Sequence, residues 1–143
     1  MRLVALVLVL LVIAGCGGTP SARERFASAL NALCDDFQQR ERTIGAPHSI
    51  EELAAKGPRI VEAFDRAIAD RIGDLEPPPE LAADAHELEA LARKQHDALA
   101  GLAAAAQARQ LGALDRLSRE NLRLNAESGA VARRLGAKRC SGG

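Results

Sequence analysis

Large aromatic side chains are almost missing from this chain of 143 residues. It has no Trp and no Tyr, and its only aromatic residues are Phe26, Phe37 and Phe64. Sites for sugars commonly stack the sugar ring on the flat apolar face of an exposed aromatic side chain. The scarcity of such faces disfavours a protein that binds peptidoglycan or other glycans.

An excess of charge of either sign is also lacking. Lys and Arg together number 19, and so do Asp and Glu. Proteins bind nucleic acids by placing clustered positive charges on phosphates, and a balanced chain produces no strong field of that kind. We therefore expect no nucleic-acid partner.

The motifs of common enzyme classes are absent as well. The chain contains no G-x-S-x-G turn, no phosphate-binding P-loop and no H-E-x-x-H pair. Ser118 and Ser128 fall inside expected helices without an evident His partner. We expect the protein not to be an enzyme.

Ligands for a metal ion or a haem are few. The histidines are His48, His86 and His96, and none of them follows a Glu by three residues as in di-iron helical bundles. His86 and His96 are ten residues apart, which places them on different faces of one helix. With no C-x-x-C-H sequence present either, we expect neither a metal site nor a cofactor.

The N-terminus is a short apolar run. Met1 and Arg2 precede Leu3–Ala14, about twelve apolar residues. This length is typical of the hydrophobic region of a signal peptide and falls short of the roughly 20 residues that span a bilayer as a helix. The pattern predicts a secretory signal peptide over residues 1–15.

The signal ends in Ile13-Ala14-Gly15-Cys16. This aliphatic-small-small-Cys sequence resembles the lipobox of bacterial lipoproteins. The resemblance implies cleavage between Gly15 and Cys16, attachment of diacylglycerol to the Cys16 thiol, and a lipid anchor that holds the protein on the extracytoplasmic face of the cell membrane. An ordinary signal peptide with a coincidental cysteine, or a short core strand, would be the alternative interpretation.

Residues 16–22 then form only a short tether. Two or three acyl chains suffice for stable anchoring, whereas one chain binds marginally. Six extended residues reach roughly 20 Å, so we expect the domain of residues 23–140 to lie close to the membrane surface, followed by a tail over residues 141–143.

Two cysteines remain, Cys34 and Cys140. An even pair in an exported protein predicts a structural disulfide. The alternative is a redox-active or metal-binding pair, but redox pairs usually have C-x-x-C spacing. The neighbouring Asp35 and Asp36 would raise the pKa of the Cys34 thiol rather than lower it.

The remaining sequence has helical periodicity throughout. Apolar residues recur every three or four positions, which is typical of amphipathic helices. The stripes predict four helices, marked by Phe26, Leu30, Leu33 and Phe37; by Ile60, Phe64, Ile68 and Ile72; by Leu81, Leu88, Leu99 and Leu102; and by Leu114, Leu117, Leu124, Val131 and Leu135. Asn121 and Ser128 also fall on the last stripe, as a core defect or a register device.

Several residues punctuate these helices. Ser49 and Glu52 form a capping box at the start of the second helix, and Gly57-Pro58 should kink it or split off a first short turn. In the stretch Leu75–Leu81, the last of three prolines suits the first position of the third helix. Gly136 is a natural terminator of the fourth.

Four helices with short connections predict an all-α, antiparallel up-down four-helix bundle. A bridge from Cys34, well inside the first helix, to Cys140, beyond the fourth, requires one of two adjustments. Either the first turns of helix one project from the bundle toward the membrane, or the C-terminal tail folds back. We favour the first.

The helix-one cysteine Cys34, the P-P-P-x-L junction at residues 77–81 and the terminal R-R-L-G…C sequence, residues 133–140, resemble small secreted or lipid-anchored helical proteins of high-G+C bacteria. This resemblance implies a disulfide-closed helical bundle. It does not assign an activity to the protein.

Two functions fit these observations. The protein is expected to be a non-catalytic interaction module that presents a helical face to a protein of the cell envelope. The alternative is a carrier that binds a small apolar ligand in the bundle interior. The second requires a cavity, and the Ala-rich stretch of residues 102–108 does not distinguish a cavity from close helix packing.

Overall fold

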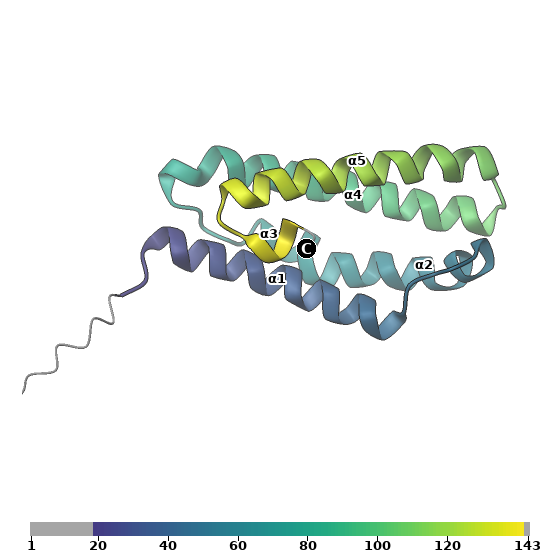
Figure 1. Cartoon of the computed structure of the whole chain (residues 1–143), viewed down its shortest axis with the longest axis horizontal. Coiled ribbons are helices and arrows are strands. Elements are labelled where there is room, and N and C mark those ends of the chain that lie inside the picture. The colour runs from purple at the N-terminus through teal and green to yellow at the C-terminus, as the bar shows by residue number, and fades with distance from the viewer. Residues whose placement is uncertain (1–18, 142–143) are drawn as a thin grey trace, which may run out of the picture.

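The computed structural model describes residues 19–141, and within that range the chain is all helical, as expected, with no strand (Figure 1). No helix in this part of the chain is long and apolar enough to cross a membrane. The elements are α1 (Ala22–Ile44), α2 (Ile50–Phe64), the π-helical turn η1 (Asp65–Ala69), α3 (Asp70–Ile72), the 3₁₀ turn η2 (Pro79–Leu81), α4 (Ala82–Gln107), α5 (Leu111–Arg134) and the 3₁₀ turn η3 (Lys138–Ser141).

A capping box that the sequence analysis did not identify starts α1. Ser21 Oγ accepts a hydrogen bond from the Glu24 N–H at 3.2 Å, and the Glu24 carboxylate accepts one from the Ser21 N–H at 2.7 Å. Both bonds satisfy N–H groups that have no partner within a helix. The Ser21 backbone bond is also the main reason why the pKa of Glu24 is lowered.

Ser49 is the N-cap of α2, as the sequence predicts, and its Oγ accepts the Glu52 N–H at 3.1 Å. The return bond differs from a standard capping box, because the Glu52 carboxylate accepts the N–H of His48 rather than that of Ser49. Lys56 Nζ lies 2.9 Å from the same carboxylate and is the main cause of the lowered pKa of Glu52.

Of the two effects expected of Gly57-Pro58, a kink or a split, the split is absent, and the helix runs unbroken from Ile50 to Phe64. Pro58 has no N–H to donate to the carbonyl of Ala54. The side-chain amide of Gln107, on α4, donates to that carbonyl instead, at 3.4 Å. The missing intrahelical bond is therefore replaced by a bond between two helices.

The second expected helix is interrupted later, at the π-helical turn η1. A π-helical turn holds more residues than an α-helical one, so the spacing of inward residues changes there. Phe64, Ala67 and Ile72 are all buried, at intervals of three and five residues. The apolar face thus stays turned to the core through α2, η1 and α3.

The boundaries of the later helices agree with the sequence. Pro79 opens η2, which leads directly into α4, and α4 ends at Gln107. The turn before α5 includes Arg109, which has a positive φ of 53°. Gly136 follows α5 with a φ of 81°, a conformation that favours glycine.

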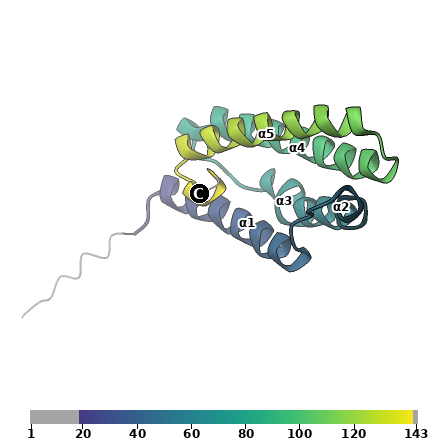
Figure 2. The same cartoon turned by 45° about the vertical axis from the view of Figure 1, so that its right-hand side comes forward.

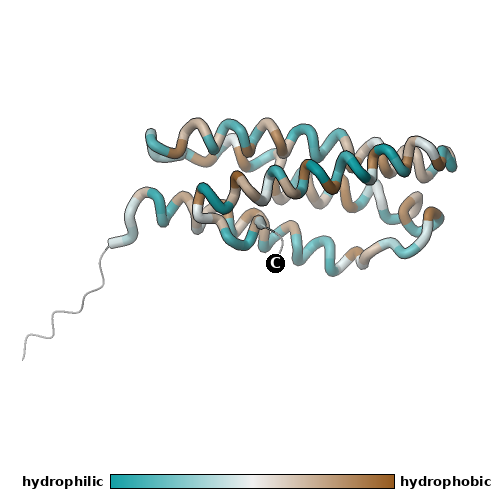
Figure 3. The backbone as a smooth tube through the Cα atoms, turned by 45° about the horizontal axis from the view of Figure 1, so that its top comes forward, coloured by the Kyte–Doolittle hydropathy of each residue, from teal (hydrophilic) through white to brown (hydrophobic). Residues whose placement is uncertain are grey.

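The helices form two layers, with α1, α2 and α3 in one and α4 and α5 in the other (Figure 2). Contacts between α2 and α4 join the layers. Figure 3 shows hydrophobic and hydrophilic residues alternating along the helices, as amphipathic packing requires. The most deeply buried large side chains are Leu30, Leu124, Val131 and Leu135.

Candidate functional site

The two distant cysteines meet beside α1. Cys34 and Cys140 form a disulfide with their Cα atoms 5.3 Å apart, across a sequence separation of 106 residues. The expected structural bridge is therefore present. The proposed cleavage and lipidation residues, Gly15 and Cys16, lie outside the described residues.

The C-terminal tail reaches Cys34 by folding back, so the adjustment that we favoured from the sequence is wrong. Phe26, in the first turns of α1, is only 6% exposed and belongs to the main core, so these turns do not project from the bundle. The chain reverses after Gly136, buries Ala137 completely, and places η3 between α1 and α5 (Figures 1 and 2).

Hydrogen bonds fix this returning tail on α1. Asn31 Oδ1 accepts the N–H of Arg139 at 2.9 Å, and Gln38 Nε2 donates to the carbonyl of Arg139 at 3.1 Å. On the other side, a Cβ on Gly129 would lie 3.3 Å from the carbonyl oxygen of Ser141. Gly129 therefore gives the tail room to pass close to α5.

A cavity of about 460 Å³ extends from the disulfide between α1 and α5, and we call it the interhelix groove. Its volume falls in the range of about 300–1,000 Å³ that is typical of small-molecule sites. The disulfide and η3 line one end. The floor is largely apolar and is formed by Ile60, Phe64, Ile68, Ile72, Leu88 and Leu99.

An aromatic pair stands where the floor meets the α1 wall. The rings of Phe37 and Phe64 are 5.4 Å apart and perpendicular, the edge-to-face arrangement that aromatic pairs prefer. Phe64 is buried, whereas Phe37 is half-buried and faces the groove. Two of the three aromatic residues of the chain therefore line this one site.

The α5 side of the groove is polar but uncharged. Ser128 is buried, and its hydroxyl donates to Gln95 Oε1 at 3.0 Å. Gln95 Nε2 in turn donates to Asn125 Oδ1, and Asn121 lines the groove one turn away. Ser128 and Asn121, which the sequence placed on the apolar stripe, thus belong to a polar wall that includes Gln95.

Gln95 could have been identified from the sequence. It continues the inward positions of α4 marked by Leu88, Ala92, Leu99 and Leu102, at alternating intervals of four and three. A polar residue on such a stripe needs a buried partner. The partner, Ser128, is a residue of α5, and no local pattern connects the two.

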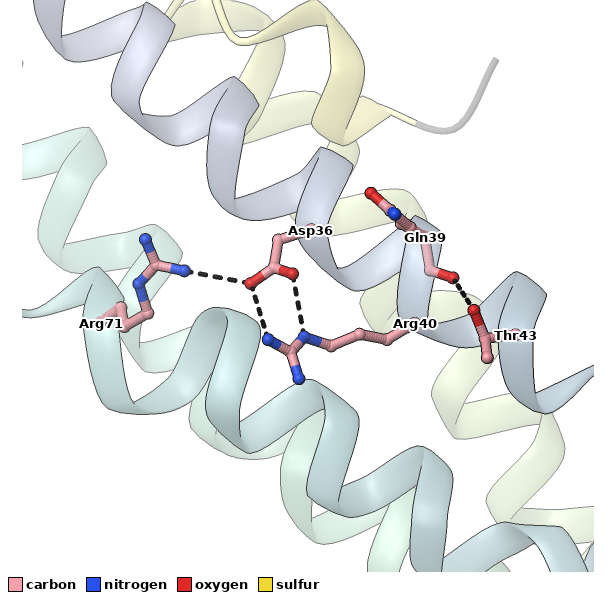
Figure 4. Close-up of polar contacts among 5 residues, drawn as sticks. All are labelled: Asp36, Gln39, Arg40, Thr43 and Arg71. Carbon is pink, nitrogen blue, oxygen red and sulfur yellow. Dashed lines mark hydrogen bonds and ion pairs between the residues drawn. The ribbon is translucent and has the colours of Figure 1, made fainter.

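A second hollow, of about 420 Å³, lies between α1 and α2 and is lined mainly by charged side chains. Asp36 accepts bonds from Arg40 at 2.9 Å and from Arg71 at 3.1 Å, and Thr43 donates to the carbonyl of Gln39 (Figure 4). These pairs are partly exposed, and ion pairs of this kind contribute little to stability. We do not assign a ligand to this hollow.

The histidines do not gather. His96 Nδ1 lies 2.6 Å from Asp65 Oδ1 and links α4 to η1, His86 Nδ1 lies 3.8 Å from Glu89 Oε2, and His48 is exposed at the start of α2. Among residues 19–141, no group of three or more His, Cys, Asp and Glu side chains is placed to hold a metal ion.

Comparison with known proteins adds no relative. No protein-family model, curated protein or solved structure matches the chain.

Proposed function

We propose that the protein is a membrane-anchored lipoprotein of the extracytoplasmic face that acts by binding rather than by catalysis. The lipobox sequence ending in Gly15 and Cys16 supports the anchor. The start of α1 at Ala22 supports a short tether, because six residues after Cys16 span roughly 20 Å at most. The domain would therefore work within reach of the bilayer surface.

The finer architecture is part of this proposal. We take the bundle to be antiparallel and up-down, with each helix returning along the one before it. Two contacts support this order: Arg23, at the start of α1, donates to the carbonyl of Arg134 at the end of α5, and Cys34 bonds to the tail that returns beside Gly129. Residues farther along α1 thus pair with earlier residues of α5.

The interhelix groove carries the functional part of the proposal. It combines an apolar floor, a volume suited to a small molecule and a set of uncharged polar side chains on one wall, the usual composition of a small-ligand site. This favours the carrier function, in which the bundle holds a small apolar ligand, over an interaction module without a cavity.

A protein partner in the envelope is the second candidate function. The observation that favours it is an apolar hollow at the opposite end of the bundle from the start of α1, where Leu111 is 63% exposed. Pro47, Ile50, Leu53 and Leu114 line the same hollow. Apolar surface of this kind marks interaction sites when it is contiguous.

Photolabelling of the intact protein in its own membrane tests the binding function. A small hydrocarbon that carries a diazirine is irradiated in these membranes, and the labelled residues are mapped by mass spectrometry. We expect labelling at Phe37, Phe64 or Leu99. Labelling confined to residues outside the groove would contradict the proposal.

A matched pair of variants controls for non-specific labelling. Ala126 is exposed and lines the groove, so Ala126→Trp should fill part of it and reduce groove labelling several-fold. Ala32 is exposed on α1 but does not line the groove. Ala32→Trp adds the same side chain and should leave the labelling unchanged.

A further inference from the structure

The shape of the groove limits what can occupy it. On α4 its floor extends from Leu88 to Leu99, and eleven residues at 1.5 Å each give a length of roughly 16 Å. A cavity of about 460 Å³ over that length has a mean cross-section of about 29 Å². An α-helix with side chains is 10–12 Å wide, a cross-section of roughly 80–110 Å². A helix from a partner is therefore too wide to enter the groove fully.

A single hydrocarbon chain does fit. One methylene occupies about the volume of a water molecule in the liquid, roughly 30 Å³, and an extended chain advances about 1.2 Å per bond. These values give a cross-section of about 25 Å² for the chain. The length of the floor accommodates about 14 carbon atoms.

The floor suits a flexible aliphatic chain. Branched aliphatic side chains form most of it, and the aromatic pair stands at its edge with perpendicular rings. No pair of parallel aromatic faces is available among the described lining residues for a flat ring system to stack between. Apolar burial without directional contacts is the interaction that a methylene chain supplies.

The polar lining indicates an uncharged end group. Gln38, Gln95, Asn121, Asn125 and Ser128 carry no charge, and amide and hydroxyl groups both donate and accept hydrogen bonds. The hydrogen-bond donors and acceptors that these side chains do not use among themselves match hydroxyl or amide groups of a ligand.

The charged residues near the groove disfavour an acid. Arg139 lies at the disulfide end, where its Nε is 3.6 Å from Asp35 Oδ2, so its charge is partly offset. Glu41 lies two turns beyond Cys34 on α1 and adds a negative charge to the other part of the groove. A carboxylate end group would be repelled there.

We infer that the interhelix groove binds a single-chain amphiphile with an aliphatic chain of about 14 carbon atoms and an uncharged, hydrogen-bonding headgroup, such as a monoacylglycerol. This inference rests on the proposed binding function and narrows its ligand class. The lipid anchor would keep the groove close to a source of such molecules.

The test uses the intact protein in its membrane and photoreactive 1-monoacylglycerols with chains of 10, 14 and 20 carbons. We expect the 10- and 14-carbon probes to label the groove and the 20-carbon probe to label it several-fold less, because the longer chain exceeds the floor. Unlabelled 14-carbon monoacylglycerol should compete at least fivefold better than the 14-carbon fatty acid. Glu41 is exposed, and Glu41→Gln should reduce the preference for the monoacylglycerol over the fatty acid.

The outcomes distinguish a failure of this inference from a failure of the proposed binding function. Equal groove labelling by all chain lengths, or better competition by the fatty acid, would overturn the ligand class while leaving a hydrocarbon-binding groove. Absence of groove labelling by every monoacylglycerol and also by the small hydrocarbon would overturn both. The Ala126→Trp variant should lose the monoacylglycerol signal and Ala32→Trp should keep it, with circular dichroism confirming that both remain helical.

Discussion

Gln107 on α4 donates a hydrogen bond to the carbonyl of Ala54 on α2, the oxygen that Pro58 leaves without its normal partner. The bond explains how a proline lies inside an unbroken helix. It also connects the two layers at the end of α4, where Gly57 and Ala103 approach closely.

Replacing Gln107 with Leu should remove this bond. Because the site is exposed and the bond is long, we expect the free energy of unfolding to fall by only about 0.5 kcal/mol, the low end for a hydrogen bond. Urea denaturation measures the change. In a Pro58→Ala background the residue at 58 supplies its own N–H to Ala54, so the effect of Gln107→Leu should nearly vanish. Equal effects in both backgrounds would contradict this assignment.

Gly57→Ala should destabilise the bundle, although Ala normally favours a helix by about 1 kcal/mol over Gly. The new Cβ would lie 2.7 Å from the Cβ of Ala103, so α2 and α4 must move apart, at a cost of about 1–3 kcal/mol for overpacking. Thermal unfolding should show a lower Tm.

Gly112→Ala is the matched control for this substitution. Gly112 lies in the first turn of α5, and a Cβ there meets nothing within 4 Å, so the change should be neutral or slightly stabilising. Ala103→Gly should rescue Gly57→Ala only in part, because it removes the opposing Cβ but leaves the backbone Cα of residue 103 at 3.1 Å from the new Cβ. A Gly57→Ala protein as stable as the Gly112→Ala protein would show that the two helices adjust freely.

Local signals explain why much of the fold could be predicted. Ser49, the proline run and Gly136 act on the backbone within a few residues of themselves, so their effects on helix ends are visible in the sequence. The π-helical turn at Asp65 was not predicted, and the sequence left open whether Pro58 would kink α2 or split it, because both features depend on packing against α4. The path of the tail also depends on distant contacts, with Asn31, Gln38 and Gly129.

The groove was predictable only in part. Phe37, Asn121 and Ser128 stood out on apolar stripes, and the carrier alternative required a cavity. The volume of that cavity depends on how far η3 holds α1 from α5. The periodicity of apolar residues does not predict this distance.

The capping box at Ser21 should make the stability of the fold depend on pH in the acidic range. The pKa of Glu24 is lowered in the folded protein, chiefly by the Ser21 N–H, so folding favours the ionised carboxylate. This contribution is present above the pKa of Glu24 in the unfolded chain, near 4.3, and is lost as the pH falls through the lower folded value.

Glu24→Gln should therefore lower stability at neutral pH and flatten the decline in stability below pH 5. Denaturant titrations at several pH values measure both effects. Ser21→Ala removes the hydroxyl half of the box and should weaken α1 at every pH. An unchanged acid profile in Glu24→Gln would show that other carboxylates, Glu52 among them, dominate the acid response.

Cys16→Ser should abolish lipidation, because the Cys16 thiol is the group that would receive diacylglycerol in the proposed lipobox. Metabolic labelling with a fatty-acid analogue should mark the wild-type protein and not the variant, which should accumulate as an uncleaved or mislocalised precursor. Cys34→Ser is the matched control, since Cys34 is bonded to Cys140 and should not affect labelling. Equal labelling of wild type and Cys16→Ser would refute the lipoprotein assignment.

The disulfide should stabilise the bundle by restricting the unfolded chain. Its loop spans 106 residues, for which the chain-entropy relation gives about 4.7 kcal/mol. Cys34→Ala with Cys140→Ala should therefore remain helical by circular dichroism but unfold at a Tm lower by roughly 10 °C or more, at about 3–6 °C per kcal/mol for a domain of this size. Reduction of the wild type should give a similar shift and leave the double variant unchanged.

Asn31→Ala tests the folded-back tail independently of the disulfide. Asn31 holds the N–H of Arg139 without taking part in the disulfide, so its loss should cost about 1 kcal/mol while the bridge stays closed. In the double cysteine variant the tail is held by fewer contacts, and Asn31→Ala should then increase the hydrogen exchange of residues 138–141 markedly. Thiol counting on the denatured, unreduced wild type completes the test. Two free thiols besides Cys16 would refute the bridge.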